Sequence, residues 1–125
     1  MQIKDHKLVG AAYLAAHHIG GVITPEIVIL HDTAGRLEKG NSAAYLASDN
    51  TGKVSVHFVV ERDGSISQHV PTNRQANHAG KSRFHGREWC NGFSIGIEIV
   101  NPGKMTTVGE LGRHLQFGGY AADKG

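Results

Sequence analysis

The chain has 125 residues, of which 39% are hydrophobic and 19% are charged, and its formal charge at pH 7 is +2. This length fits one domain around one core, the small charge without a basic stripe argues against a nucleic-acid partner, and no apolar run approaches the ~20 residues of a membrane-spanning helix. The 17 glycines and 9 histidines instead indicate many turns together with metal or acid–base chemistry.

The N-terminal arm, residues 1–25, is expected to form a short helix or an irregular segment. Its apolar stretch at 8–16 resembles a short signal peptide. However, Asp5 stands in the charged region before it, and His17 and His18 stand where a cleavage site would lie. We therefore expect a cytoplasmic protein without a signal peptide.

The next segments predict a strand, a helix and a second strand. Residues 26–31 form an aliphatic run typical of a strand covered on both faces. Residues 43–47 predict a helix capped by Asn41 or Ser42, and residues 54–61 alternate as a strand. The two strands are joined by a connection of about twenty residues that contains the helix, and a connection of this length favours a parallel crossover. On the second strand, the apolar residues expected on one face are Val54, Val56, Phe58 and Val60.

The remaining core segments complete a mixed sheet. The pair Asp63-Gly64 is typical of a tight hairpin turn, so residues 66–70 should return antiparallel. Residues 71–92 lack hydrophobic periodicity and predict a long surface loop, and residues 93–100 predict the last strand. The expected fold class is α/β, with a mixed central β-sheet flanked by helices.

We interpret residues 1–125 as a single domain with a core at 26–103 and an atypical tail at 104–125. The tail is only weakly helical, around residues 110–117. The single cysteine, Cys90, excludes an intramolecular disulfide and is interpreted as a small packed thiol.

Two residues on the predicted strands carry candidate chemistry. His31 ends the first strand, where it could ligate zinc or, alternatively, be a buried histidine bonded to backbone. Glu98 should share a face with Ser94 and Gly96, opposite the isoleucines of its strand, and Gly96 leaves room for a group to approach the sheet. A glutamate beside a metal-bound water can take its proton and deliver it to a leaving amine.

The other histidines divide into two groups. His78 lies in the predicted loop, where it either lines a substrate groove or is idle, and His57 is interpreted as a core or supporting residue rather than a ligand. The histidines that lack ligand-like spacing to a partner and receive no role are His6, His17, His18, His69, His85 and His114.

Four motifs in order carry a family resemblance. They are IVILHDTAG at 27–35, VSVHFVVERDG at 54–64, NHAGKS at 77–82 and NGFSIGIEIVN at 91–101. Over about residues 26–103 the chain resembles the type 2 family of N-acetylmuramoyl-L-alanine amidases, which shares its fold with peptidoglycan recognition proteins and amidase-type phage lysozymes.

The resemblance implies a Zn²⁺ enzyme that hydrolyses the amide bond between N-acetylmuramic acid and L-alanine in peptidoglycan or its fragments. By position, His31 matches the first zinc ligand and Glu98 the catalytic acid/base. His78, with Asn77 and Lys81 beside it, matches the substrate groove. Some relatives carry a tyrosine where this chain has Val56. In this chain, Glu98 would have to take over the catalytic role of that tyrosine.

The tail departs from the family pattern. The family's two further zinc ligands, a histidine in a Gly-His context and then an aspartate, cysteine or histidine near a Pro-Gly turn, have no match in residues 104–125. We therefore expect a C-terminally truncated amidase whose activity as this chain alone is in question. The alternatives are a non-catalytic muropeptide-binding module and a truncated relative that forms a homo-oligomer through the face left open by a missing helix.

Overall fold

The computed structural model describes residues 1–103, and it builds the N-terminal arm from strands. Strands β1 (Ile3–Lys4) and β2 (Lys7–Leu8) pair as an antiparallel hairpin. Strand β3 (Ala12–Tyr13) joins the main sheet, and β4 (Ile19–Val22) follows it. The arm therefore contains no helix among its described residues, and the helical alternative for it is wrong.

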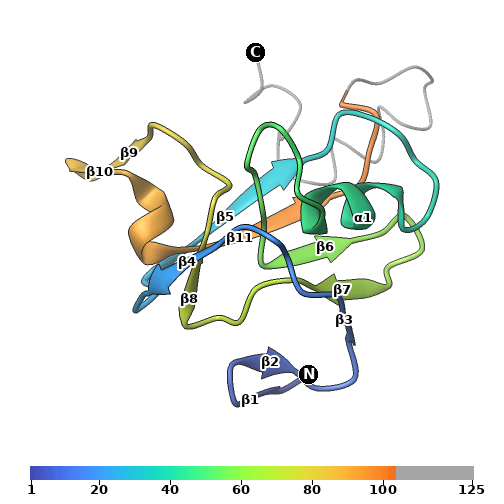
Figure 1. Cartoon of the computed structure of the whole chain (residues 1–125), viewed down its shortest axis with the longest axis horizontal. Helices are drawn as coiled ribbons and strands as arrows, with labels where there is room; N and C mark the ends of the chain where they lie inside the picture. Colours follow the sequence, from blue (N-terminus) through green and yellow to red (C-terminus); the bar gives the residue numbers. More distant parts are fainter. Residues whose placement is uncertain (104–125) are drawn as a thin grey trace.

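The main sheet has five strands in the order β3-β7-β6-β11-β5 (Figure 1). Its other members are β5 (Ile27–Asp32), β6 (Phe58–Val60), β7 (Ile66–Gln68) and β11 (Ser94–Ile99). Strand β11 lies between β5 and β6 and runs parallel to both, whereas β7 is antiparallel to β6. The predicted mixed sheet, the parallel crossover and the hairpin at Asp63-Gly64 are confirmed.

Strand β5 forms an edge of this sheet, with β11 as its one neighbour there. Val28 and Leu30 are 59% and 56% exposed, while Ile27 and Ile29 on the other face are partly buried. The prediction that this strand is covered on both faces is therefore wrong for the described chain. An aliphatic run indicates a strand, but it does not tell whether both faces are covered.

Helix α1 (Asn41–Ala47) follows the predicted segment but not the predicted cap. Its N-cap is Gly40, with φ +84°, and no side chain caps the helix, so the expectation of a cap by Asn41 or Ser42 is wrong. The Gly40 N–H instead donates to Oε2 of Glu61 over 3.2 Å. A carboxylate from the neighbouring segment thus satisfies a donor at the start of the helix.

The core beneath α1 explains why the predicted alternation of residues 54–61 fails. The strand begins only at Phe58, and the preceding residues are irregular, so Val56 and Val59 both turn into the same cluster. That cluster consists of Ala43, Val56, Val59 and Val100, with Leu46 packed against it. Ala43 and Leu46 belong to α1, which lies against this part of the sheet (Figure 1).

The predicted loop at 71–92 is largely structured. Strand β8 (Arg74–Ala76) pairs antiparallel with β4, and β9 (Arg83–Phe84) pairs with β10 (Arg87–Glu88). The 3₁₀ helix η1 (Cys90–Phe93) follows and buries the free thiol of Cys90, as predicted. Among residues 1–103 there is no helix long and apolar enough to cross a membrane. The predicted helical turn at 110–117 lies outside the described residues.

Two fully buried histidines hold the strands together as neutral rings. His57 accepts a hydrogen bond at Nδ1 from the Gly96 N–H (3.0 Å) and donates from Nε2 to the Arg74 carbonyl (2.8 Å). His69 donates from Nδ1 to the Leu14 carbonyl (2.7 Å), and its Nε2 lies 2.8 Å from the Ser67 hydroxyl. Burial lowers the pKa of both rings, more than these carbonyl contacts raise it.

These rings predict a loss of stability in mild acid. The histidine pKa is lower in the folded than in the unfolded chain, so stability is fully present above the unfolded pKa of about 6.5 and falls as the pH drops below it. Urea unfolding between pH 7.5 and 5 should show a decrease of up to about 1.4 kcal/mol per pH unit for each such histidine. His69→Gln should be less stable at pH 7.5 yet less sensitive to acid. An unchanged slope in that variant would contradict this role.

Candidate active site

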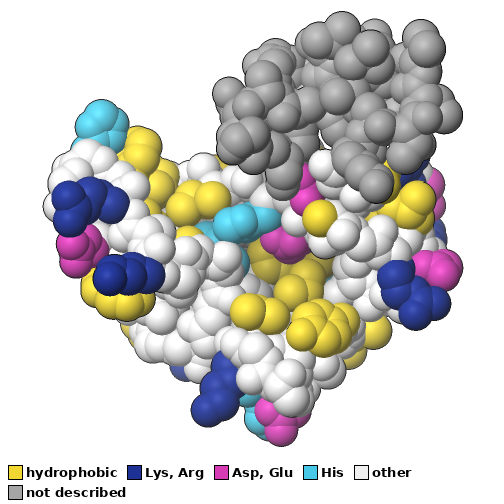
Figure 2. Space-filling view, turned by 90° about the horizontal axis from the view of Figure 1, so that it is seen from above, with side chains coloured by type: hydrophobic (Ala, Val, Ile, Leu, Met, Phe, Trp, Pro, Cys, Tyr) yellow, Lys and Arg dark blue, Asp and Glu magenta, His cyan; other side chains and the backbone are white. Residues whose placement is uncertain are grey.

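The pairing of β5 with β11 places His31 beside Glu98. The two residues are register partners in neighbouring parallel strands, so their side chains leave the same face of the sheet. Ser94 and Gly96 alternate onto this face as well, as the sequence predicted. Val59 is the partner of Glu98 on β6, which puts α1 on the same side. Figure 2 shows histidine and acidic side chains side by side in a hollow on one face of the molecule.

The ring of His78 fills the space above Gly96. A Cβ added at Gly96 would lie 2.6 Å from both Nδ1 and Cδ2 of the ring, closer than real Cβ contacts come. The predicted approach of another group to the sheet at Gly96 is therefore confirmed, and the group is an imidazole. Its loop is held by Asn91, whose Oδ1 accepts from the N–H groups of His78 (3.1 Å) and Ala79 (2.8 Å).

A chain of hydrogen bonds runs from Ser94 through His78 to His31. The Ser94 Oγ lies 3.1 Å from Nε2 of His78, and Nδ1 of His78 lies 3.0 Å from Nε2 of His31. The Ser94 hydroxyl donates its one proton to the Cys90 carbonyl (2.6 Å), so it accepts from His78 Nε2–H. Nδ1 of His78 must then accept from His31 Nε2–H.

This proton arrangement requires a neutral His78. Burial, and then the nearby rings of His31 and His57, lower the pKa of His78 to about 3. The hydrogen bond from His31 Nε2–H to His78 orients the His31 ring. A metal-ligating histidine is typically oriented in this way, by a hydrogen bond at one ring nitrogen while the other nitrogen binds the metal.

The two remaining predicted substrate residues lie in the same loop. The Asn77 side chain donates to the Lys53 carbonyl (3.1 Å), and its backbone N–H donates to the Ser55 hydroxyl (2.9 Å), so it anchors the loop to the segment before β6. Lys81 is exposed. A role of either residue in substrate binding stays a prediction.

The described residues complete only part of a zinc site at His31. The hydrogen bond from His31 to His78 is of the kind that orients an imidazole ligand, but a catalytic zinc needs three protein ligands. Within residues 1–103, the cluster of three potential ligand side chains consists of His17, His18 and Asp49 and does not include His31. We therefore derive no step through a metal. No role for His17 and His18 could be predicted, because their spacing in the sequence does not reveal that the fold brings them to Asp49.

Comparison with known proteins places the chain in a family. Residues 22–120 match the sequence model of the N-acetylmuramoyl-L-alanine amidases. The chain belongs to the N-acetylmuramoyl-L-alanine amidase family. The match begins before and extends beyond the core of residues 26–103 on which the motifs were recognised.

Individual amidases of the family support the same assignment. The chain is 49% identical over 59 residues to the 1,6-anhydro-N-acetylmuramyl-L-alanine amidase AmpD of Citrobacter freundii, covering 47% of this chain and 32% of that protein. The crystal structure of a selenomethionine AmpD derivative superposes with a TM-score of 0.74 at 28% identity, covering 92% of this chain and 74% of the other. The chain spans about a third or less of the length of the curated relatives it matches.

A third relative was solved with a substrate. Escherichia coli AmiD, in complex with anhydro-N-acetylmuramic acid-L-Ala-D-gamma-Glu-L-Lys, superposes with a TM-score of 0.50 at 31% identity. The superposition covers 75% of this chain and 37% of that one. The fold resemblance thus extends to an amidase that holds a peptidoglycan fragment.

The contact between Gly96 and His78 predicts that a side chain at position 96 destabilises the fold. Gly96→Ala should displace the ring and destabilise the fold by about 1–3 kcal/mol, because the added Cβ overpacks a filled space. Urea unfolding measures this loss. Gly21→Ala is the matched control on β4, where a Cβ meets nothing within 4 Å, and it should change stability by less than about 1 kcal/mol. Equal effects of the two substitutions would refute the contact.

Proposed function

We propose that the chain hydrolyses the amide bond between N-acetylmuramic acid and L-alanine in peptidoglycan fragments, in a zinc-dependent reaction. The observation that carries this proposal is the register of Glu98 with His31, beside the imidazole of His78. It puts a carboxylate next to an oriented histidine at the carboxyl end of parallel strands, where α/β sheets present their chemistry.

In this proposal Glu98 moves the proton. Water attacks the amide carbonyl carbon, Glu98 takes a proton from that water, and the carbon–nitrogen bond breaks as Glu98 returns the proton to the leaving amine. The products are the lactyl carboxyl group of the sugar and the free amino group of the L-alanyl peptide. Glu98 is again an ionised carboxylate at the end of the reaction.

His31 is the residue that we assign to the zinc ion, which would supply Lewis acidity toward the carbonyl oxygen. His78 positions His31 rather than reacting itself, since both of its nitrogens are engaged by Ser94 and His31. The loop that carries Asn77 and Lys81 is proposed to contact the sugar or the peptide. Asn77 directly precedes His78 and Lys81 stands three residues after it, so both belong to the loop that carries His78.

The proposed substrate is a released wall fragment rather than intact wall. Two relatives that are 49% and 55% identical over their matched segments are named as 1,6-anhydro-N-acetylmuramyl-L-alanine amidases, and we take this anhydro compound to be a released wall fragment. The proposal therefore places the chain in the recycling of such fragments. Faster turnover of intact sacculi than of a soluble anhydro-N-acetylmuramoyl peptide would contradict this part.

The reaction is tested with the 125-residue chain, added Zn²⁺ and a soluble anhydro-N-acetylmuramoyl peptide, by measuring release of the free L-alanyl amine. Glu98→Gln should lower kcat/KM at least ~100-fold, because the amide side chain cannot accept and return a proton. Glu88→Gln is the matched control, since Glu88 lies on exposed β10 in an ion pair with Arg83. Full activity of Glu98→Gln would refute the assignment. Fragment binding without turnover in the unmodified chain would instead favour a binding module.

A further inference from the structure

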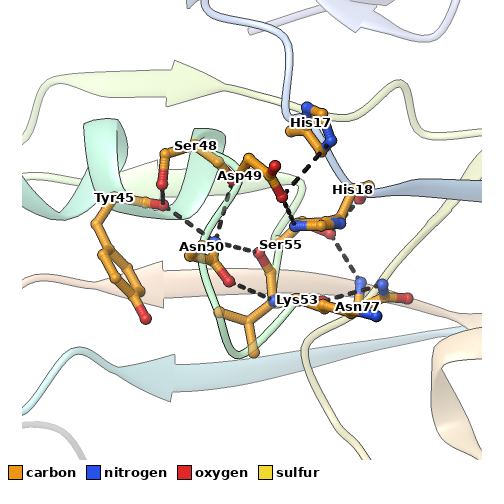
Figure 3. Close-up of polar contacts among 10 residues, drawn as sticks. His17, His18, Tyr45, Ser48, Asp49, Asn50, Lys53, Ser55 and Asn77 are labelled. Atoms are coloured by element: carbon orange, nitrogen blue, oxygen red, sulfur yellow. Dashed lines mark hydrogen bonds and ion pairs between the residues drawn. The ribbon is translucent and has the colours of Figure 1, made fainter.

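A cluster of potential metal ligands, separate from His31, lies at the C-terminal end of α1. His17 and His18 come from the segment between β3 and β4, and Asp49 follows Ser48, the C-cap residue of α1 (Figure 3). Oδ1 of Asp49 lies 3.2 Å from Nε2 of His18 and 3.6 Å from Nε2 of His17. One ligand atom from each of the three residues lies within 4.8 Å of the other two.

The backbone holds the histidine pair in place from both sides. The His17 N–H donates to the Ala47 carbonyl at the end of α1 (2.9 Å), and the Ser55 hydroxyl donates to the His18 carbonyl (2.6 Å). Ser55 also accepts from the Asn77 N–H (2.9 Å). The histidine pair is therefore fixed between the helix and the loop that leads to His78.

Asp49 is positioned by its neighbour Asn50, which is buried (Figure 3). The Asn50 side-chain amide donates to the carbonyl groups of Tyr45 (3.1 Å), Ser48 (3.2 Å) and Val54 (2.9 Å), and its Oδ1 accepts from the Val54 N–H (2.8 Å). This network ties the helix end to the following turn. The backbone at Asp49, whose carboxylate faces the two histidines, is therefore held in place by these hydrogen bonds.

The contact between His18 and Asp49 has the spacing of shared ligands rather than the alignment of a hydrogen bond. Nε2 of His18 is buried and has no hydrogen-bond partner among the described residues, although the carboxylate oxygen is 3.2 Å away. With metal–ligand bonds of about 2.0–2.1 Å, ligand atoms in a tetrahedral zinc site lie about 3.4 Å apart. The two measured separations, 3.2 and 3.6 Å, lie on either side of that value.

We propose that His17, His18 and Asp49 bind one Zn²⁺ or a similar divalent transition-metal ion, in a site separate from His31. Two imidazoles and one carboxylate suit such ions, whereas Ca²⁺ and Mg²⁺ prefer oxygen ligands. The side chains of His17 and Asp49 are 58% and 71% exposed, which gives the ion an entry path and leaves room for water as the fourth ligand. The bound ion links the N-terminal arm to the end of α1. The proposal does not depend on amidase activity.

The site is tested with Co²⁺ as a spectroscopic probe, in the full chain carrying His31→Ala so that the proposed catalytic ligand is absent. Titration should give one visible-absorbing Co²⁺ per chain. His18→Asn and Asp49→Asn, added singly, should each weaken binding about 10-fold or more, because each removes one of three ligands. His85→Asn, in the exposed turn between β9 and β10, is the matched control and should bind like its parent.

Thermal unfolding gives a second readout. Zn²⁺ should raise the Tm of the His31→Ala chain, because it binds the folded state, and Asp49→Asn should reduce the increase measured at the same Zn²⁺ concentration. Circular dichroism without metal checks that each variant is folded. Absence of saturable Co²⁺ binding in the His31→Ala chain would overturn the proposal and leave the cluster as an ion pair only. Equal binding by the variants and the control would overturn it as well.

Discussion

The close packing of the His78 ring on the bare Cα of Gly96 is the contact on which the candidate site depends. Any side chain at Gly96 would occupy the position of the ring. Because the ring sits there, its two nitrogens reach Ser94 on β11 and His31 on β5 at the same time. A glycine on β11 thus fixes the orientation of a histidine on the neighbouring edge strand β5, through a loop residue that contacts both.

The order of the strands determines which residues surround this contact. Since β11 lies between β5 and β6, Glu98 has His31 on one side and Val59 on the other. Val59 packs under α1, so the hydrophobic core and the polar site share one face of the sheet. The buried ring of His57 ties the same strand to β8 through Gly96 and Arg74. Core packing and hydrogen bonding therefore position the same short segment of β11.

Much of this arrangement could be predicted from the sequence. Local patterns gave the strands around His31 and Glu98, the hairpin at Asp63-Gly64 and the open space at Gly96. The helix cap, the face of Val56 and the coverage of β5 could not be predicted, because each depends on residues distant in sequence, such as Glu61 at the start of α1. The cluster of His17, His18 and Asp49 was missed for the same reason, since only the fold brings the arm to the end of the helix.

The candidate site requires that His78 is a neutral ring that orients His31. Imidazole ¹⁵N NMR of the metal-free chain distinguishes ring nitrogens with and without a proton, because the two differ strongly in chemical shift. His78 should keep its proton on Nε2 and should not titrate between pH 7.5 and 5.5. A His78 ring that titrates in that range, or that carries its proton on Nδ1, would overturn this assignment.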